Sequence, residues 1–141
     1  MKIKKLLELP ISSSGCANVK VIASSAELLV IYGFNSRKDS SKLIGQILFD
    51  SVISYSFRNT MHSRGYADGS YDSLVEIESS DWMKWLLEIE PPMIGNTVAG
   101  KKHFAVFFSE NGYLEVVADS YKVLPYEEGR LNYPEFEEYI D

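Results

Sequence analysis

The sequence HFAVFFSENGYLEVVADSYKVL occupies residues 103–124 and has the pattern of a β-hairpin. Two runs rich in Phe, Val and Tyr flank residues 109–112, where Ser109 suits the first position of a type I turn and Gly112 can adopt the left-handed conformation that closes it. A three-residue loop with a bulge at Gly112 leaves one face wholly apolar, whereas a two-residue loop would place Glu115 among apolar side chains. The sequence therefore predicts the bulged hairpin as the centre of a sheet with one buried face.

The bulged register assigns a set of side chains to each face of the hairpin. The first face carries Phe104, Val106, Phe108, Leu114, Val116 and Ala118. The second face carries His103, Ala105, Phe107, Tyr113, Glu115 and Val117.

Further strands are predicted before the hairpin. Alternating or continuous apolar runs indicate strands at residues 18–24, 26–34 and 73–79, and a strand or short arm at residues 2–10. Residues 43–59 exceed the typical strand length of about five or six residues, so a bend is expected at Asp50-Ser51. The prediction is an α+β fold, mainly an antiparallel or mixed sheet of about six or seven strands with one amphipathic helix, at about residues 80–90, packed on it.

The helix has clear start and stop signals. Ser79 or Ser80 can cap it, Asp81 suits its positive end, and the pair of prolines at 91 and 92 ends it. Trp82, Trp85, Leu86 and Ile89 fall on one stripe at helical spacing. This stripe is expected to pack the helix onto the sheet.

Length and cysteine content indicate a single domain in a reducing compartment. The 141 residues suffice for one core without disulfides, and the single Cys16 can form none within the chain. The apolar patch near the start is interrupted by Glu8 and Pro10, so neither an export signal nor a membrane span is expected. We expect a cytoplasmic domain over residues 1–141, in which residues 125–141 form an acidic C-terminal segment.

Charge is unevenly distributed along the chain. Residues 1–42 carry seven Lys or Arg and three Asp or Glu, residues 43–126 carry six and eleven, and residues 127–141 carry one and six, within a net charge of −6. Phosphate binding needs a basic face, so nucleic acid is not an expected partner. An acidic surface favours a basic protein partner, although such acids also serve simply to keep a domain in solution.

Motifs for catalysis or cofactor binding are not found. The chain has no GxGxxG, GxxxxGK or GxSxG sequence, and two histidines with one cysteine fall short of a zinc site. Asp68, Asp72, Glu76 and Glu78 do not have the spacing of a calcium loop. No cofactor, metal or catalytic residue is therefore predicted, and the chain is not expected to be an enzyme.

Three segments together carry a resemblance to a protein group. They are FDSVISYSFRN at 49–59, SSDW at 79–82 and HFAVFFSENGYLEVVADSYKV at 103–123. Over residues 43–124 the chain resembles small, mostly uncharacterised bacterial proteins that have a His-Phe/Tyr hairpin ending in an EVVA strand. Some proteins of that kind are similar to immunity proteins of bacterial toxin systems, which implies an acidic cytosolic domain that binds and blocks a toxin. The resemblance brings no set of functional residues with it.

The leading hypothesis is a non-catalytic protein-binding domain, most concretely an immunity-type inhibitor of a basic toxin. Its contacts would be surface acids with aromatic anchors between them, acting by charge complementarity. The acids are Glu76, Glu78, Glu127, Glu128, Glu135, Glu137 and Glu138, and the aromatic anchors are Tyr126, Tyr133 and Tyr139. A solvated tail without a binding role accounts equally well for the residues of the C-terminal segment.

Two other functions stay open. In a sheet domain that binds a small molecule or carbohydrate, a pocket would be lined by aromatic side chains, namely Tyr66, Tyr71, Trp82 and Trp85. In an enzyme, carboxylates would surround His62 or His103, and a buried histidine with a carboxylate partner in a cleft would favour that function. A homodimer through an open sheet edge is compatible with all three.

Overall fold

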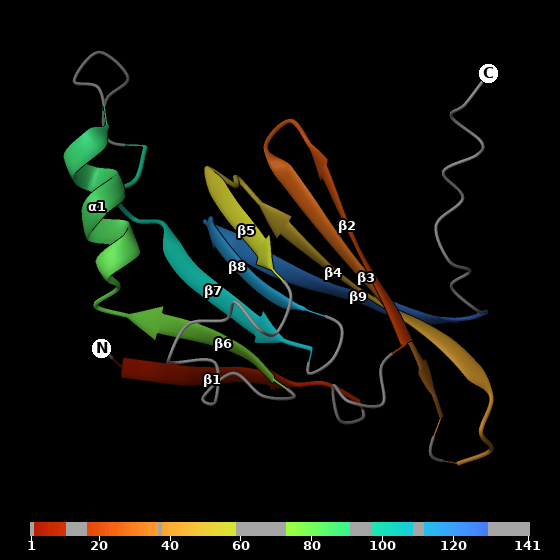
Figure 1. Cartoon of the computed structure of the whole chain (residues 1–141). Coiled ribbons are helices and arrows are strands. Elements are labelled where there is room, and N and C mark those ends of the chain that lie inside the picture. The colour runs from red at the N-terminus through yellow and green to blue at the C-terminus, as the bar shows by residue number, and fades with distance from the viewer. Residues whose placement is uncertain are drawn as a thin grey trace.

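A computed structural model of the protein describes residues 2–10, 17–36, 38–58, 73–90, 97–108 and 112–129. These residues form nine strands and one helix (Figure 1). The strands are β1 (Lys2–Glu8), β2 (Ala17–Ser24), β3 (Glu27–Asn35), β4 (Lys42–Asp50), β5 (Ser54–Arg58), β6 (Ser73–Glu78), β7 (Lys102–Phe107), β8 (Tyr113–Ala118) and β9 (Ser120–Glu128), and the helix is α1 (Asp81–Ile89).

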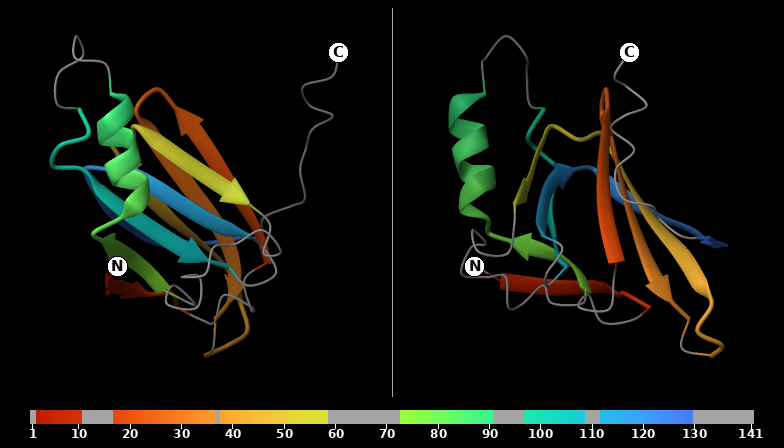
Figure 2. Two further views of the ribbon diagram at one scale, coloured as in Figure 1. Left: turned by 60° about the vertical axis from the view of Figure 1, so that its left-hand side comes forward. Right: turned by 45° about the vertical axis from the view of Figure 1, so that its right-hand side comes forward.

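The strands form two antiparallel sheets. The five-stranded sheet has the order β1-β6-β7-β8-β5, and the four-stranded sheet has the order β2-β3-β4-β9. Figure 2 shows α1 on the far side of the five-stranded sheet from the four-stranded sheet, so that the layers run helix, sheet, sheet. The fold is α+β and dominated by antiparallel sheet, as predicted.

The predicted register of the central hairpin is confirmed. Strands β7 and β8 pair with Val106 opposite Leu114, and the amide of Phe108 donates to the carbonyl of Gly112 at 2.8 Å. This pairing leaves three residues in the loop, and Gly112 has a φ of +119°, which favours glycine. The apolar face of the hairpin accordingly lies in the main core, between the two sheets.

The expectation of only one buried face on this sheet is wrong. His103 and Glu115, on the second face of the hairpin, are as buried as the phenylalanines of the first. Ala105, Phe107 and Tyr113 form a second apolar cluster there with Val75 and Ile77 of β6. Burial of His103 and Glu115 is tolerated because both side chains are hydrogen-bonded, as described below.

Residues 43–59 bend as predicted, and the bend joins the two sheets. Strand β4 ends at Asp50, Ser51 has a φ of +54°, and β5 resumes at Ser54 in the other sheet. Strand β9 leaves β8 at the same corner, where the amide of Asp119 donates to the carbonyl of Asp50 at 3.0 Å. The ribbon β4-β9 thus continues into the ribbon β5-β8, and such bends are the usual way for strands to change sheets.

The number of strands exceeds the predicted six or seven for two reasons. The bend divides residues 43–59 into β4 and β5, and the corner at Asp119 divides the second hairpin strand into β8 and β9. Strand β9 also extends to Glu128, so residues 125–128 of the acidic C-terminal segment belong to the four-stranded sheet.

We expect the corner to contribute stability that depends on pH. The Lys101 ammonium donates to the Asp119 carboxylate at 2.9 Å and holds the pKa of that carboxyl below its ordinary value of 3.8. A lowered pKa stabilises the fold above the ordinary value, and this contribution disappears as the pH falls through the folded-state pKa. Asp119→Asn should therefore lower the melting temperature at about pH 7 but much less at about pH 2. An equal difference at both pH values would contradict this contribution, and Glu127→Gln, on an exposed residue, is the control.

Helix α1 begins as predicted but presents a different face to the sheet. Ser80 is its N-cap and accepts a hydrogen bond from the amide of Met83 at 3.2 Å. Trp82, Met83 and Leu86 are partly buried, whereas Trp85 and Ile89, which were expected to pack on the sheet, are 54% and 51% exposed. Ser80 and Trp82 both contact His103, and these contacts fix how the helix is turned about its axis.

The main core consists of aromatic and aliphatic side chains from both sheets. Phe104 of β7 lies with its ring centroid 5.6 Å from that of Phe49 and 5.7 Å from that of Tyr121, both in the four-stranded sheet. Tyr32 of β3 lies 5.9 Å from Phe108. These ring contacts hold the two sheets face to face.

Candidate functional site

The second face of the hairpin carries a row of buried polar side chains. In the β7-β8 register, His103 lies opposite Val117 and Ala105 lies opposite Glu115, so His103 and Glu115 are diagonal neighbours. Strand β5 adds Arg58 opposite Tyr113, and the N-cap of α1 adds Ser80. Three strands and the helix start therefore place four polar side chains together, which we call the buried cluster: Arg58, Ser80, His103 and Glu115.

The buried cluster is a continuous chain of hydrogen bonds. Ser80 Oγ lies 2.6 Å from His103 Nδ1, and His103 Nε2 lies 2.9 Å from Glu115 Oε1. The second carboxylate oxygen, Oε2, accepts from Nη2 of Arg58. Because a carboxylate only accepts, the arrangement suits the tautomer of His103 with its proton on Nε2, and the Ser80 hydroxyl then donates to Nδ1 while it accepts from Met83.

Rings and burial isolate the cluster from solvent. Trp82 stands edge-on to the imidazole of His103 with the centroids 5.1 Å apart, and the Arg58 guanidinium lies 5.7 Å from the centre of the Tyr113 ring. The side chain of Glu115 is fully buried, whereas that of Arg58 is 27% exposed. Arg58 is thus the member of the buried cluster whose charged side chain is partly exposed to water.

The order serine, histidine, carboxylate is also that of hydrolase triads. An enzyme was expected to show a buried histidine with a carboxylate partner in a cleft, and His103 with Glu115 meets the first part of this condition. A nucleophile must also reach its substrate. Ser80 is 5% exposed and His103 is 1% exposed, and the serine hydroxyl is already engaged by the helix amide and the imidazole. The geometry therefore suits a structural link between α1 and the sheet. His62 lies outside the described residues.

The sequence contains a signal for the buried cluster, but its pattern alone did not identify all four members. The predicted register had already placed His103 and Glu115 on the same face, and a carboxylate within an otherwise apolar strand requires partners if it is buried. Arg58 and Ser80 lie 57 and 35 residues from Glu115 in the sequence. Only the pairing of β5 with β8 and the docking of α1 bring them to it.

We expect loss of the Ser80 hydroxyl to destabilise the fold measurably. Ser80→Ala removes both the N-cap of α1 and the partner of His103 Nδ1. Loss of an N-cap costs about 0.5–2 kcal/mol. We expect a decrease of this size or more in the free energy of unfolding, measured by urea denaturation. Ser120→Ala, at an exposed position of β9, is the control, and equal stability of the two variants would contradict the link.

The acids predicted to bind a partner lie in separate regions. Glu76 and Glu78 are on β6, where they lie opposite Lys4 and Lys2 of β1. Opposite charges in register attract, so the charge of these two acids is partly balanced within the sheet. The end of β9 that carries Glu127 and Glu128 lies on the other side of the molecule from β6 (Figures 1 and 2).

The end of β9 brings three of the predicted residues together. Tyr126, Glu127 and Glu128 are consecutive and exposed, and β9 is an edge strand that pairs with β4. The ring of Tyr126 is held edge-on by Phe34, with the centroids 5.2 Å apart, and still exposes 46% of its surface. The other predicted residues of the tail lie outside the described residues: Tyr133, Glu135, Glu137, Glu138 and Tyr139.

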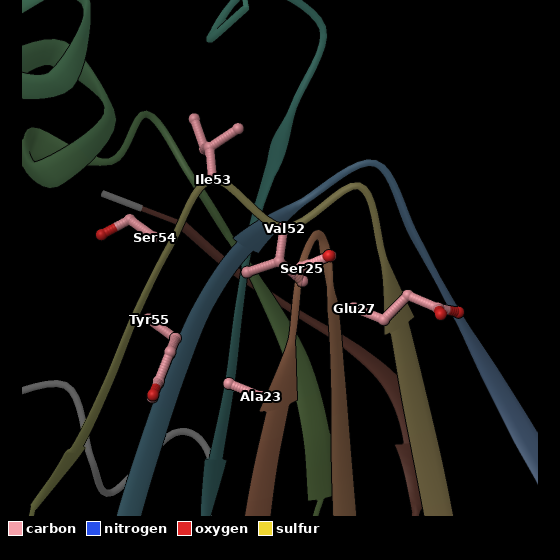
Figure 3. A pocket seen from close by; sticks show the side chains of 7 residues that line it. All are labelled: Ala23, Ser25, Glu27, Val52, Ile53, Ser54 and Tyr55. Atoms are coloured by element: carbon pink, nitrogen blue, oxygen red, sulfur yellow. The ribbon is translucent and has the colours of Figure 1, made fainter.

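The aromatic pocket of the small-molecule hypothesis is not assembled by its described members. Trp82 packs on His103 and Trp85 is exposed, whereas Tyr66 and Tyr71 lie outside the described residues. A cavity of about 240 Å³ lies elsewhere, between the β2-β3 turn and the start of β5 (Figure 3). Its single charged side chain is Glu27, and its volume is below the roughly 300 Å³ at which ligand pockets begin.

The described residues contain no group of three or more His, Cys, Asp or Glu side chains that could hold a metal ion. Asp68 and Asp72, two of the four acids considered for calcium, are outside this part of the chain. The helix in the described part of the chain is not long and apolar enough to cross a membrane.

Comparison with protein-family models, with curated proteins and with solved structures found no match to this chain.

Proposed function

We propose that this chain is a non-catalytic protein-binding domain, an inhibitor of the immunity type that engages a basic partner such as a toxin. The observation that supports it is the exposed end of β9, an edge strand on which Tyr126, Glu127 and Glu128 follow one another, with Tyr126 on the side of Phe34 and Glu127 on the outer side. An aromatic side chain beside carboxylates is a common means of binding a basic surface, because the ring supplies contact area and the charges steer association.

The charge of the rest of the chain supports the same partner class. The net charge is −6, and residues 130–141, which follow Gly129 in the sequence, add four acids and one arginine. Long-range attraction accelerates the encounter of an acidic protein with a basic one, and salt weakens it. Binding to a basic partner should accordingly be strongest at low ionic strength.

The experiment is a pull-down from lysate of the source organism with the tagged full-length chain, at low and at moderate salt. Three variants are compared with it: Glu127→Gln/Glu128→Gln, Glu76→Gln/Glu78→Gln, and a chain lacking residues 130–141. The two double variants lose the same charge, so they separate a local contact from a general effect of charge. Retained proteins are identified by mass spectrometry.

We expect a basic protein to be retained at low salt and to be lost or weakened in the Glu127→Gln/Glu128→Gln variant. The β6 variant should retain it, because Glu76 and Glu78 lie opposite lysines. Loss of residues 130–141 should weaken retention further if that segment extends the contact. Absence of any basic protein at either salt concentration, or equal loss in both double variants, would overturn the proposal.

The proposal includes a cytoplasmic location for this inhibitor. The single cysteine in 141 residues supports a compartment in which disulfides are not used for stability. Cell fractionation with an antibody to the chain tests the location, and recovery in the membrane or the exported fraction would contradict it.

A further inference from the structure

The outer face of the four-stranded sheet is unusually apolar for a surface. Alternation along β2, β3, β4 and β9 directs one set of side chains into the core and the other set outward. The outward set includes six aliphatic side chains, which we call the aliphatic face: Ile22, Leu29, Ile31, Ile44, Leu48 and Leu124. None of them belongs to either core cluster. Ile22 is 49% exposed, and the other five are partly buried.

The strand register makes the aliphatic face contiguous. Leu29 lies between Ile22 and Leu48 in one row across the sheet. The next row places Ile31 opposite Gln46, which in turn lies opposite Leu124. Side chains in adjacent rows of one face touch, so the six form a single patch and are not isolated apolar residues.

The described helix and the other sheet leave this face uncovered. The five-stranded sheet packs against the opposite face, and α1 lies beyond it (Figure 2). Soluble proteins seldom expose a contiguous apolar patch of this kind unless it is an interaction site.

The charges around the aliphatic face are balanced, and four of the six are placed so that they can pair with opposite charges of a second copy of the chain. Three lysines and three acids border it: Lys20, Lys42, Lys122, Glu27, Asp50 and Glu127. Asp50 and Lys42 stand at opposite ends of β4, and Lys122 and Glu127 stand on either side of Leu124 on β9. A two-fold axis across the strands would bring Asp50 over Lys42 of the second copy and Lys122 over its Glu127.

We propose that the aliphatic face is the interface of a symmetric homodimer. This interface lies on a sheet face, in contrast to the dimer through an open sheet edge with which the sequence was compatible. Balanced charge matters here, because two chains of net charge −6 repel each other elsewhere on their surfaces. An isologous dimer needs one self-complementary patch, and the charge pairs named above occur twice in it. Glu127 also belongs to the proposed contact with a basic partner, so the dimer and that complex would compete for this carboxylate.

The area of the aliphatic face determines how strong the dimer is expected to be. Four strands about 4.8 Å apart and about eight residues long, at about 3.3 Å per residue, cover about 500 Å². Two copies would bury a total near the roughly 1,000 Å² at which specific interfaces begin. The dimer is therefore expected to be weak and to depend on protein concentration.

The test is sedimentation velocity of the full-length chain from about 1 μM to about 300 μM, a range suited to weak association. The wild type should shift from monomer to dimer over this range. Ile31→Lys/Leu48→Lys should stay monomeric with an unchanged circular dichroism spectrum. Ile53→Lys/Trp85→Lys, which adds the same charge at exposed apolar residues away from the face, should dimerise like the wild type.

A charge exchange provides a second test that leaves the apolar side chains intact. Lys122→Glu places like charges together across the interface and should weaken the dimer, whereas Lys122→Glu/Glu127→Lys should restore it. A monomer at every concentration, or a dimer unaffected by Ile31→Lys/Leu48→Lys, would overturn the proposal. A chain that dimerises only after residues 130–141 are removed would also overturn it, and would assign the face to that segment.

Discussion

Replacing Glu115 with alanine is expected to lower the free energy of unfolding by about 3–5 kcal/mol, the usual cost of breaking a buried ion pair from one side. Glu115 is fully buried and bonds to both His103 and Arg58. Its removal leaves a guanidinium and an imidazole without this partner in a region of low dielectric constant. Urea denaturation monitored by tryptophan fluorescence measures the change.

The control for this prediction is Glu127→Ala, which removes an exposed carboxylate and should change stability by less than about 0.5 kcal/mol. A second variant, Arg58→Leu/Glu115→Leu, removes both charges and should be more stable than Glu115→Ala, because no unpaired guanidinium remains. If Glu115→Ala were as stable as the wild type, the cluster could not be a structural link.

Phe104→Ala is the second substitution expected to have a large effect. Phe104 is 1% exposed and packs on Phe49 and Tyr121 across the interface between the sheets. Removing a buried phenylalanine ring costs about 3–5 kcal/mol through lost burial and the cavity left behind. We expect a decrease of this size, measured by thermal and urea denaturation.

Phe57→Ala is the matched comparison, because Phe57 is on the edge strand β5 and is 38% exposed. It should cost clearly less than Phe104→Ala. Equal costs would mean that the contact between the sheets is not the main source of stability.

Local sequence signals predicted the parts of the fold that depend on neighbours in the chain. Gly112 and the wholly apolar face that it gives the hairpin predicted the register, although Glu115 proved to be buried on the other face. Asp50-Ser51 marked the bend, and Ser80 marked the start of the helix. Each of these features is confirmed by the structure.

Features that depend on distant pairings were not predictable in the same way. The division into two sheets follows from the corner at Asp119, which no turn-forming glycine or proline marks. The orientation of α1 is determined by His103, a residue 23 positions from Ser80. Likewise, Glu76 and Glu78 lie opposite lysines only because the first strand pairs with the sixth.

The most direct measurement compares partner binding by two variants, Ser80→Ala and Glu127→Gln/Glu128→Gln, in the same pull-down at low salt. The buried cluster is proposed to stabilise the fold and the exposed end of β9 to recognise the partner. Ser80→Ala should therefore be less stable but retain the basic partner, while Glu127→Gln/Glu128→Gln should be as stable as the wild type and lose it. Loss of the partner by folded Ser80→Ala, with full retention by the β9 variant, would contradict this division of roles.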